Sequence, residues 1–213
     1  MNTLYNTDIP GWMWDKELII LSTLASLVPE NGSILELGCF LGRSTSALYA
    51  GKNQNVKLDI VDCFKGIPHT ARFAEEKLRG DPVLYEKAQT IAMQSGWENA
   101  FRYCIGEKIS SDINVFPTLT NNFEISKPYD LTFIDASHSI LDVINDINKF
   151  SSDEGLLIGD DFIRQHAGVS SAINVTRRDR MVIVFENTKL WVMLPTHGYW
   201  REVFKNNNLL FLD

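Results

Sequence analysis

The chain has 213 residues, of which 45% are hydrophobic and 22% are charged, and its formal net charge is -7 at neutral pH. This length and composition are typical of a globular domain with a sizeable core. The negative charge argues against nucleic acid or an anionic membrane surface as the main partner, because both would repel it. No apolar run approaches the roughly 20 residues needed to span a bilayer.

The first ten residues and the cysteines indicate the cellular compartment of the protein. Residues 1–10 have no charged segment followed by an apolar core, so we expect no secretory signal. The three cysteines, Cys39, Cys63 and Cys104, have no paired or metal-ligand spacing. Buried free thiols are typical of a reducing environment, and we therefore expect a cytoplasmic protein.

The first chemical motif follows a helix predicted over residues 15–27. A short apolar run at 34–37 predicts a strand, with Glu36 and Gly38 at its end, and Gly42 comes four residues later. Two glycines between a strand and a helix let the backbone approach a nucleotide-like ligand. They also occur where a turn needs them only for packing, and this alternative stays open.

The residues of this turn favour one ligand. A helix is predicted directly after Gly42, over residues 43–50. Glu36 would repel a pyrophosphate lying against the turn, and the middle glycine of the dinucleotide fingerprint is absent. A carboxylate suits a cationic or hydroxyl-bearing ligand. The turn therefore predicts a site for S-adenosylmethionine (SAM) and not for NAD.

Acidic residues follow the next two predicted strands. The second strand, 58–61, leads to Asp62, whose carboxylate suits the two ribose hydroxyls of an adenosine ligand. A third strand is predicted over 101–105, and Glu107 after it would lie close to the adenine ring. The alternative for both residues is an ordinary acidic side chain of a loop.

The connection between these two strands, residues 63–100, is long. It contains two helix-like pieces, 71–79 and 83–94, which Gly80-Asp81-Pro82 separates. One piece must be the crossover helix. The remainder would fold over the ligand as a lid, or would be a surface elaboration without a catalytic part.

Three carboxylates follow the fourth and fifth predicted strands, 131–134 and 156–158. Asp135 follows the first of these, and Asp160 and Asp161 follow the second. Because the carboxyl ends of parallel strands face one crevice, we expect the three side chains to lie together. Protonation or a cation relieves their repulsion, and Mg2+ prefers such oxygen ligands. Alternatively, the last two only cap the next helix.

Two histidines lie near these carboxylates in the sequence. His138 follows Asp135 by three residues, and His166 follows Asp161 by five. A neutral imidazole is a suitable general base for a hydroxyl group whose acidity a metal has raised. His138 is favoured because its spacing keeps it at the end of the same strand. A structural role is the alternative for each.

The end of the chain predicts an antiparallel hairpin from two apolar runs, 181–185 and 190–194, around a polar loop. Further helices are predicted over 139–150 and 168–176. Together these elements predict an α/β, Rossmann-like, doubly wound fold with a mostly parallel seven-stranded sheet that ends in the hairpin. We expect one domain over residues 1–213, with a helical cover at 1–30.

These motifs together resemble class I SAM-dependent methyltransferases. More narrowly, the chain resembles the metal-dependent small-molecule O-methyltransferases, which include catechol O-methyltransferase and the macrocin-type sugar O-methyltransferases. The similarity rests on three segments, 36–44, 133–139 and 159–162. It extends over about residues 9–194 and implies a small-molecule hydroxyl acceptor, such as a sugar or a catechol-like vicinal diol.

The resemblance also implies roles for particular residues. Residues that would line the methionine and ribose parts of SAM are Glu36, Gly38, Gly42 and Ser44. Residues that would hold Mg2+ against two neighbouring substrate oxygens are Asp135, Asp160 and Asp161. In the catechol branch the base is a lysine at the position of His138, and in the sugar branch the candidate is an aspartate at the position of Ser137. Neither residue is present here, but a histidine at the position of His138 also occurs in the sugar branch.

Three other functions remain open on the sequence alone. They are a SAM-binding protein without catalysis, a nicotinamide-dependent oxidoreductase, and a methyltransferase that needs no metal. The aromatic residues Trp12, Trp14, Phe64 and Trp97 would form an acceptor pocket or belong to the core. The sequence is also compatible with a homo-oligomer, because periodicity does not separate a subunit face from a core face.

Overall fold

The computed structural model describes residues 5–66 and 78–207. In this part of the chain, seven strands form one sheet in the order β3-β2-β1-β4-β5-β7-β6. They are β1 (Ser33–Leu37), β2 (Lys57–Asp62), β3 (Asn114–Pro117), β4 (Leu131–Ile134), β5 (Leu156–Gly159), β6 (Val182–Val184) and β7 (Trp191–Met193). Strands β1 to β5 are parallel, and β7 runs antiparallel between β5 and β6. The predicted fold class is confirmed.

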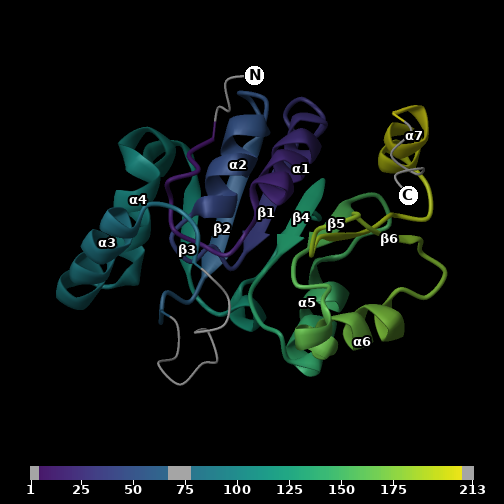
Figure 1. Ribbon diagram of the computed structural model, residues 1–213. Coiled ribbons are helices and arrows are strands. Elements are labelled where there is room, and N and C mark those ends of the chain that lie inside the picture. The colour runs from purple at the N-terminus through teal and green to yellow at the C-terminus, as the bar shows by residue number, and fades with distance from the viewer. Residues whose placement is uncertain (1–4, 67–77, 208–213) are drawn as a thin grey trace.

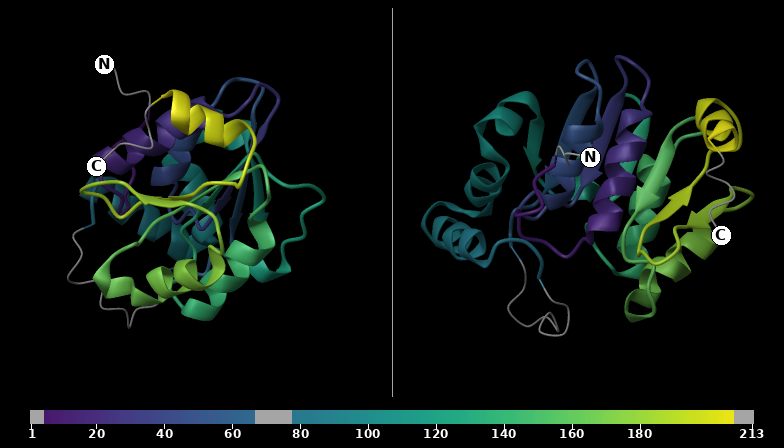
Figure 2. Two further views of the ribbon diagram at one scale, coloured as in Figure 1. Left: turned by 90° about the vertical axis from the view of Figure 1, so that its right-hand side faces the viewer. Right: turned by 45° about the horizontal axis from the view of Figure 1, so that its top comes forward.

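Helices cover both faces of this sheet (Figures 1 and 2). They are α1 (Asp15–Ser26), α2 (Arg43–Gly51), α3 (Pro82–Ser95), α4 (Trp97–Asp112), α5 (Ile140–Phe150), α6 (Ala167–Thr176) and α7 (Tyr199–Asn206). Helices α3 and α4 lie at one end of the molecule, and α7 lies at the opposite end. None of the helices in the described ranges is both long and apolar enough to cross a membrane.

The alternation of side chains along β1 explains the two layers. Ile34 packs in a core with α1, α2 and α4, whereas Leu35 and Leu37 pack in a second core with α5 and α6. Successive residues of a strand point to opposite faces, so Glu36 faces the same side as Ile34. This alternation places Glu36 beneath α2, a position that decides its role in the site.

The predicted position of the third strand, residues 101–105, was wrong. Residues 101–105 belong to α4, where Phe101, Cys104 and Ile105 are buried. Their spacing of three and four residues forms one helix face, and a run this short does not distinguish a helix from a strand. The actual third strand, Asn114–Pro117, is an edge strand with partly exposed side chains. Its apolar residues, Val115 and Phe116, form a run that is short and ends at Pro117.

The long connection between β2 and β3 is only partly described. The predicted helix at 83–94 is confirmed as α3, which packs against α4 in a helical pair. Most of the predicted helix at 71–79 lies outside the described residues. The lid function of this connection stays a prediction.

Candidate active site

A cavity of about 1040 Å³ opens at the carboxyl ends of the parallel strands. Its wall combines the segment before α1, the loops after β1 to β5 and the loop before β7. Residues of the wall include Gly11, Trp12, Gly38, Phe40, Ser44, Asp62, Phe64, Trp97, Thr118, Asn121, Asp135, His138, Asp160, Asp161, His166 and Lys189. Most of the side chains singled out in the sequence therefore meet here, as expected for an open parallel sheet.

The two glycines after β1 have different roles. Gly38 lies in the cavity wall with φ +83°, and a Cβ atom there would collide with the backbone carbonyl of Asp135. Gly42 has φ +92°, and a Cβ atom would collide with Ile105 of α4. Gly38 thus lets the turn approach the end of β4. Gly42 serves the packing of two helices, and its contact with SAM stays a prediction.

Glu36 lies behind the cavity wall and not in it. Its side chain is fully buried, and its carboxylate accepts hydrogen bonds from the hydroxyl groups of Ser44 and Thr45, the latter at 2.6 Å. Burial raises the pKa of Glu36 to about 7, although the two hydroxyl groups oppose this shift. Glu36 therefore fixes the first turn of α2, and Ser44 presents that turn to the cavity.

Asp62 joins the ends of β1 and β2. One carboxylate oxygen accepts the backbone N–H groups of Cys39 at 2.9 Å and Phe40 at 3.2 Å. The other oxygen accepts the N–H of Phe64 at 2.7 Å. A carboxylate has about four acceptor positions, so about one remains for a ligand. Asp62 shapes the turn and still has capacity for a ribose hydroxyl.

The position predicted for Glu107 was wrong, because it depended on the misplaced third strand. Glu107 is an exposed residue of α4 and does not line the cavity. The loop after the true β3 instead brings Thr118, Leu119, Thr120 and Asn121 to the wall. The sequence signal for this loop is the short, mostly apolar run at 113–116 before it, which lies outside the predicted strands.

The acidic cluster at the ends of β4 and β5 forms as predicted. Asp135, Asp160 and Asp161 each have a carboxylate oxygen within 4.8 Å of the others. Burial and the charges of the other two carboxylates raise the pKa of Asp135 well above its usual range. Asp161 has φ +62°, a left-handed conformation that costs free energy in a residue other than glycine. Such backbone strain is common at functional sites.

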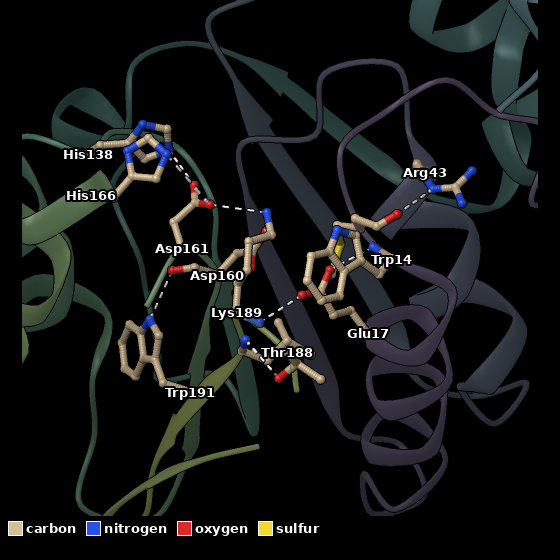
Figure 3. Close-up of polar contacts among 12 residues, drawn as sticks. Trp14, Glu17, Arg43, His138, Asp160, Asp161, His166, Thr188, Lys189 and Trp191 are labelled. Atoms are coloured by element: carbon tan, nitrogen blue, oxygen red, sulfur yellow. Dashed lines mark hydrogen bonds and ion pairs between the residues drawn. The ribbon is translucent and has the colours of Figure 1, made fainter. Parts of the chain in front are cut away.

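A lysine that the sequence did not reveal lies within this cluster (Figure 3). The Nζ atom of Lys189 lies 3.0 Å from Oδ2 of Asp160 and 3.1 Å from Oδ1 of Asp161. Burial disfavours its ammonium form, but the charges of Asp160 and Asp161 outweigh this effect and raise the pKa of Lys189. The lysine is therefore charged at neutral pH.

The Mg2+ suggested by the sequence must be tested against this arrangement. Mg2+ binds carboxylate oxygens at about 2.0–2.1 Å, so an ion shared by Asp160 and Asp161 would lie in the space that the ammonium of Lys189 holds. Two cations at such short range in a buried site repel each other strongly. With Lys189 in place, the residues of the cluster do not fit a divalent cation.

Two histidines contact the outer side of Asp161. Nε2 of His138 lies 2.5 Å from Oδ2 of Asp161, and Nε2 of His166 lies 4.0 Å from Oδ1. The hydrogen bond to Asp161 raises the pKa of His138 in spite of burial. Burial opposes ionisation of Asp161, but the bond from His138 and the charge of Lys189 hold its pKa below the usual range. His138 and Asp161 form a hydrogen-bonded acid–base pair.

Aromatic side chains form a row along the wall of the cavity. The ring of Phe40 lies 5.0 Å from that of Trp12 and 5.8 Å from that of Trp97. Phe64 also lines the cavity, whereas Trp14 does not and is partly exposed. Three of the four aromatic residues noted in the sequence therefore reach the cavity, and Phe40 was missed.

The segment that carries Trp12 is held over the cavity by Arg43 of α2. The buried guanidinium donates to the backbone carbonyls of Thr7, Ile9 and Met13, the last two at 2.9 and 3.0 Å. It also pairs with Asp15 at 2.9 Å. This network ties the N-terminal part of the described chain to the turn after β1 and forms one wall of the cavity.

Comparisons with known proteins agree with this architecture. A sequence model of a methyltransferase domain matches residues 35–162. No curated protein sequence is significantly similar to the chain. A solved protein of Corynebacterium glutamicum is 15% identical, with a TM-score of 0.56 and coverage of 88% of this chain and 83% of that one.

Two further solved structures carry more specific names. An O-methyltransferase from Bacillus cereus in complex with SAH is 14% identical, with a TM-score of 0.54 over 84% of this chain and 80% of that one. The O-methyltransferase TomG from Streptomyces achromogenes, in complex with SAM, is 15% identical, with a TM-score of 0.52 over 86% and 81%. At these identities the similarity shows a shared fold.

Proposed function

The chain belongs to the methyltransferase domain family, and from this premise we propose that it transfers a methyl group from SAM to a hydroxyl group of a small molecule. The observation that carries the proposal is one cavity that joins the Gly38 turn and Asp62 to the pair of His138 and Asp161. A cofactor half and an acid–base half thus share one space. Similar folds that hold SAH and SAM support this cofactor.

The cofactor half of the proposed site comes from the loops after β1, β2 and β3. SAM would supply an electrophilic methyl group on a positively charged sulfur. The backbone of the Gly38 turn would lie close to the ligand. The remaining acceptor position of Asp62 would take a ribose hydroxyl. The hydroxyl and amide groups of Thr118 and Asn121 replace Glu107 as the nearest candidates for the adenine end.

In the acceptor half, we propose His138 as the general base. Its Nε2 is directed at Asp161, so the free lone pair is on Nδ1. His138 would take the hydroxyl proton on Nδ1, and bound SAM would supply the methyl group for the substrate oxygen and leave as SAH. Asp161 stabilises the imidazolium that results, as a carboxylate does in other acid–base pairs. His166 is farther from Asp161 and is the second choice.

The first experiment is a calorimetric titration of SAM into the protein, with Mg2+ and again with EDTA. We expect binding in both conditions, and Asp62→Asn to weaken it at least tenfold. Asp59→Asn is the matched control, because Asp59 lies on the same strand and bonds to Asn114 and Tyr129, away from the cavity. Absence of SAM binding in the wild type would remove the methyltransferase proposal.

The second experiment follows methyl transfer from labelled SAM to a panel of phenols, catechols and sugars. His138→Gln should retain SAM binding and lose about 10²–10⁴-fold in transfer rate, the usual contribution of a general base. His197→Gln is the control, since His197 is exposed and outside the cavity. Full activity of the His138 variant would assign the base elsewhere, with His166 tested next.

The sugar or catechol-like nature of the acceptor belongs to this proposal, and the aromatic row of Trp12, Phe40 and Trp97 supports an acceptor with a flat ring or an apolar face. A homo-oligomeric state, a cytoplasmic location and the absence of nucleic-acid and membrane partners stay predictions from the sequence.

A further inference from the structure

We propose that the ammonium group of Lys189 is the resident cation of the carboxylate cluster and takes the place of a divalent metal. The cation part of this inference stands on the geometry of the cluster. Its consequence, methyl transfer without a metal, rests on the proposed function. The two parts are tested by different measurements.

The first argument is that the bridging position is already filled. Nζ of Lys189 lies 3.0 Å from Asp160 and 3.1 Å from Asp161, and its side chain is only 6% exposed. The two carboxylate side chains are 2% and 8% exposed. Charge-assisted bonds at these distances in a buried site are strong, and breaking one leaves an uncompensated buried charge.

The second argument is that the main chain of Lys189 is fixed on both sides. Its backbone N–H donates to the buried carboxylate of Glu17 at 2.8 Å, and its carbonyl accepts the N–H of Phe162 at 2.9 Å. Glu17 also accepts the backbone N–H of Trp14 at 2.7 Å. Lys189 is therefore built into the junction of α1, β5 and β7, as Figure 3 shows, and is not a surface lysine that has folded inward.

The third argument concerns the charge balance of the cluster. One ammonium and the bond from His138 satisfy Asp161. In the described part of the chain, Oδ1 of Asp160 is buried without a hydrogen-bond partner, an observation that would also suit a metal ligand. The other oxygen of this carboxylate, Oδ2, is bonded to the ammonium of Lys189, so Asp160 already has its cation.

This arrangement assigns Lys189 a positioning role. It holds Asp161 ionised and directed at His138, while His138 is the group that would touch the substrate. Chelation by a metal needs two neighbouring substrate oxygens, whereas a single hydroxyl group suffices for the pair of His138 and Asp161. The acceptor therefore needs no vicinal diol.

The test uses Mn2+ as the probe, followed by electron paramagnetic resonance of the free ion, and needs neither SAM nor an acceptor. We expect the wild type to bind no measurable Mn2+. Lys189→Ala leaves three carboxylates without their cation, and it should acquire one Mn2+ site, with affinity at least tenfold above that of the wild type. Lys108→Ala, which removes an exposed lysine of α4, should behave as the wild type.

Either of two results overturns the cation part. One is stoichiometric binding of Mn2+ by the wild type, and the other is a folded Lys189→Ala protein that binds Mn2+ no better than the wild type. Lys189→Met, which keeps the length of the side chain, gives a second variant if the alanine variant does not fold. Mn2+ binding by the wild type tests the cation part without either variant.

The catalytic consequence has its own readout. The rate of methyl transfer by the wild type should be unchanged in EDTA. If EDTA abolishes transfer and added Mg2+ restores it, the claim that transfer needs no metal is overturned. Failure of SAM to bind at all would reject the proposed function and leave the Mn2+ result standing. The two failures are therefore distinguishable.

Discussion

The buried carboxylate of Glu17 accepts the backbone N–H of Lys189 at 2.8 Å, and this bond joins α1 to the loop before β7. The two residues are 172 positions apart in the sequence. Through this bond, the N-terminal helix helps to hold the ammonium that lies between Asp160 and Asp161. A helix that contributes no atom to the cavity surface thus fixes the electrostatics of the acid–base half.

Replacing Glu17 should therefore destabilise the protein. Glu17→Ala removes the acceptor for the backbone N–H groups of Lys189 and Trp14. Unsatisfied buried donors cost about 1–3 kcal/mol each, so for the two donors we expect a loss of about 2–6 kcal/mol in the free energy of unfolding. Urea denaturation measures it, with Glu107→Ala as the exposed control. A loss below about 1 kcal/mol would mean that water replaces the carboxylate.

Gly38→Ala should abolish SAM binding. The new Cβ would collide with the carbonyl of Asp135, and φ is +83°. Gly106→Ala is a matched control for the backbone alone, because Gly106 has φ +78° and no neighbour within 4 Å of an added Cβ. Both variants should lose stability, but only the first should lose SAM binding by calorimetry. Equal SAM affinity in the two variants would show that the turn after β1 does not receive the cofactor.

Glu36 should make stability depend on pH in a defined direction. Its pKa is about 7 in the folded protein, above the ordinary value of 4.5, so the folded state holds the proton more tightly. Stability from this group is complete below about pH 4.5 and falls as pH rises toward 7. The loss is at most about 3 kcal/mol.

Glu36→Gln removes this titration and tests the prediction. Relative to the wild type, the variant should gain stability between pH 5 and pH 8, by up to the amount that the wild type loses through Glu36. Urea denaturation of both proteins at pH 5 and pH 8 gives the difference in their free energies of unfolding at each pH. Contributions of other titrating groups are common to both proteins and cancel in this difference. A pH-independent difference would show that Glu36 is ionised throughout.

The pair of His138 and Asp161 predicts the pH dependence of transfer. The hydrogen bond to Asp161 raises the pKa of His138 above its ordinary value of 6.5. A general base works only when it is unprotonated, so the rate should rise with pH to a midpoint above 6.5. Asp161→Asn removes the main cause of the shift and should move this midpoint to lower pH.

Nuclear magnetic resonance tests the same shift without a substrate. The imidazole C–H signals of His138 should titrate at lower pH in Asp161→Asn than in the wild type. An unchanged titration of His138 would contradict the pairing.

The sequence by itself determined the features that depend on local patterns. The apolar run of β1, the glycines after it and the acidic residues at the ends of β2, β4 and β5 were all placed correctly. Two rules were enough for this: side chains alternate along a strand, and the carboxyl ends of parallel strands meet at one edge of the sheet. Both rules can be applied to a few neighbouring residues. The α/β fold and the convergence of Asp135, Asp160 and Asp161 follow from them.

Local patterns failed where helix and strand periodicities are both compatible with a short run. The apolar residues at 101–105 fit either element, and only their packing against α2 and Gly42 made them part of α4. Glu107 was misplaced for this reason. Glu36 was assigned to the ligand because a sequence does not show whether a carboxylate at a strand end faces the cavity or the adjacent helix.

Lys189 is the part of the site that only the tertiary structure decided. It comes from a hairpin loop, 28 positions beyond Asp161, and nothing in its neighbourhood marks it as different from a solvated lysine. Its position results from the antiparallel pairing of β7 with β5 and from the contact with Glu17 of α1. The sequence indicated where negative charge would gather, and the packing of distant segments decided which cation balances it.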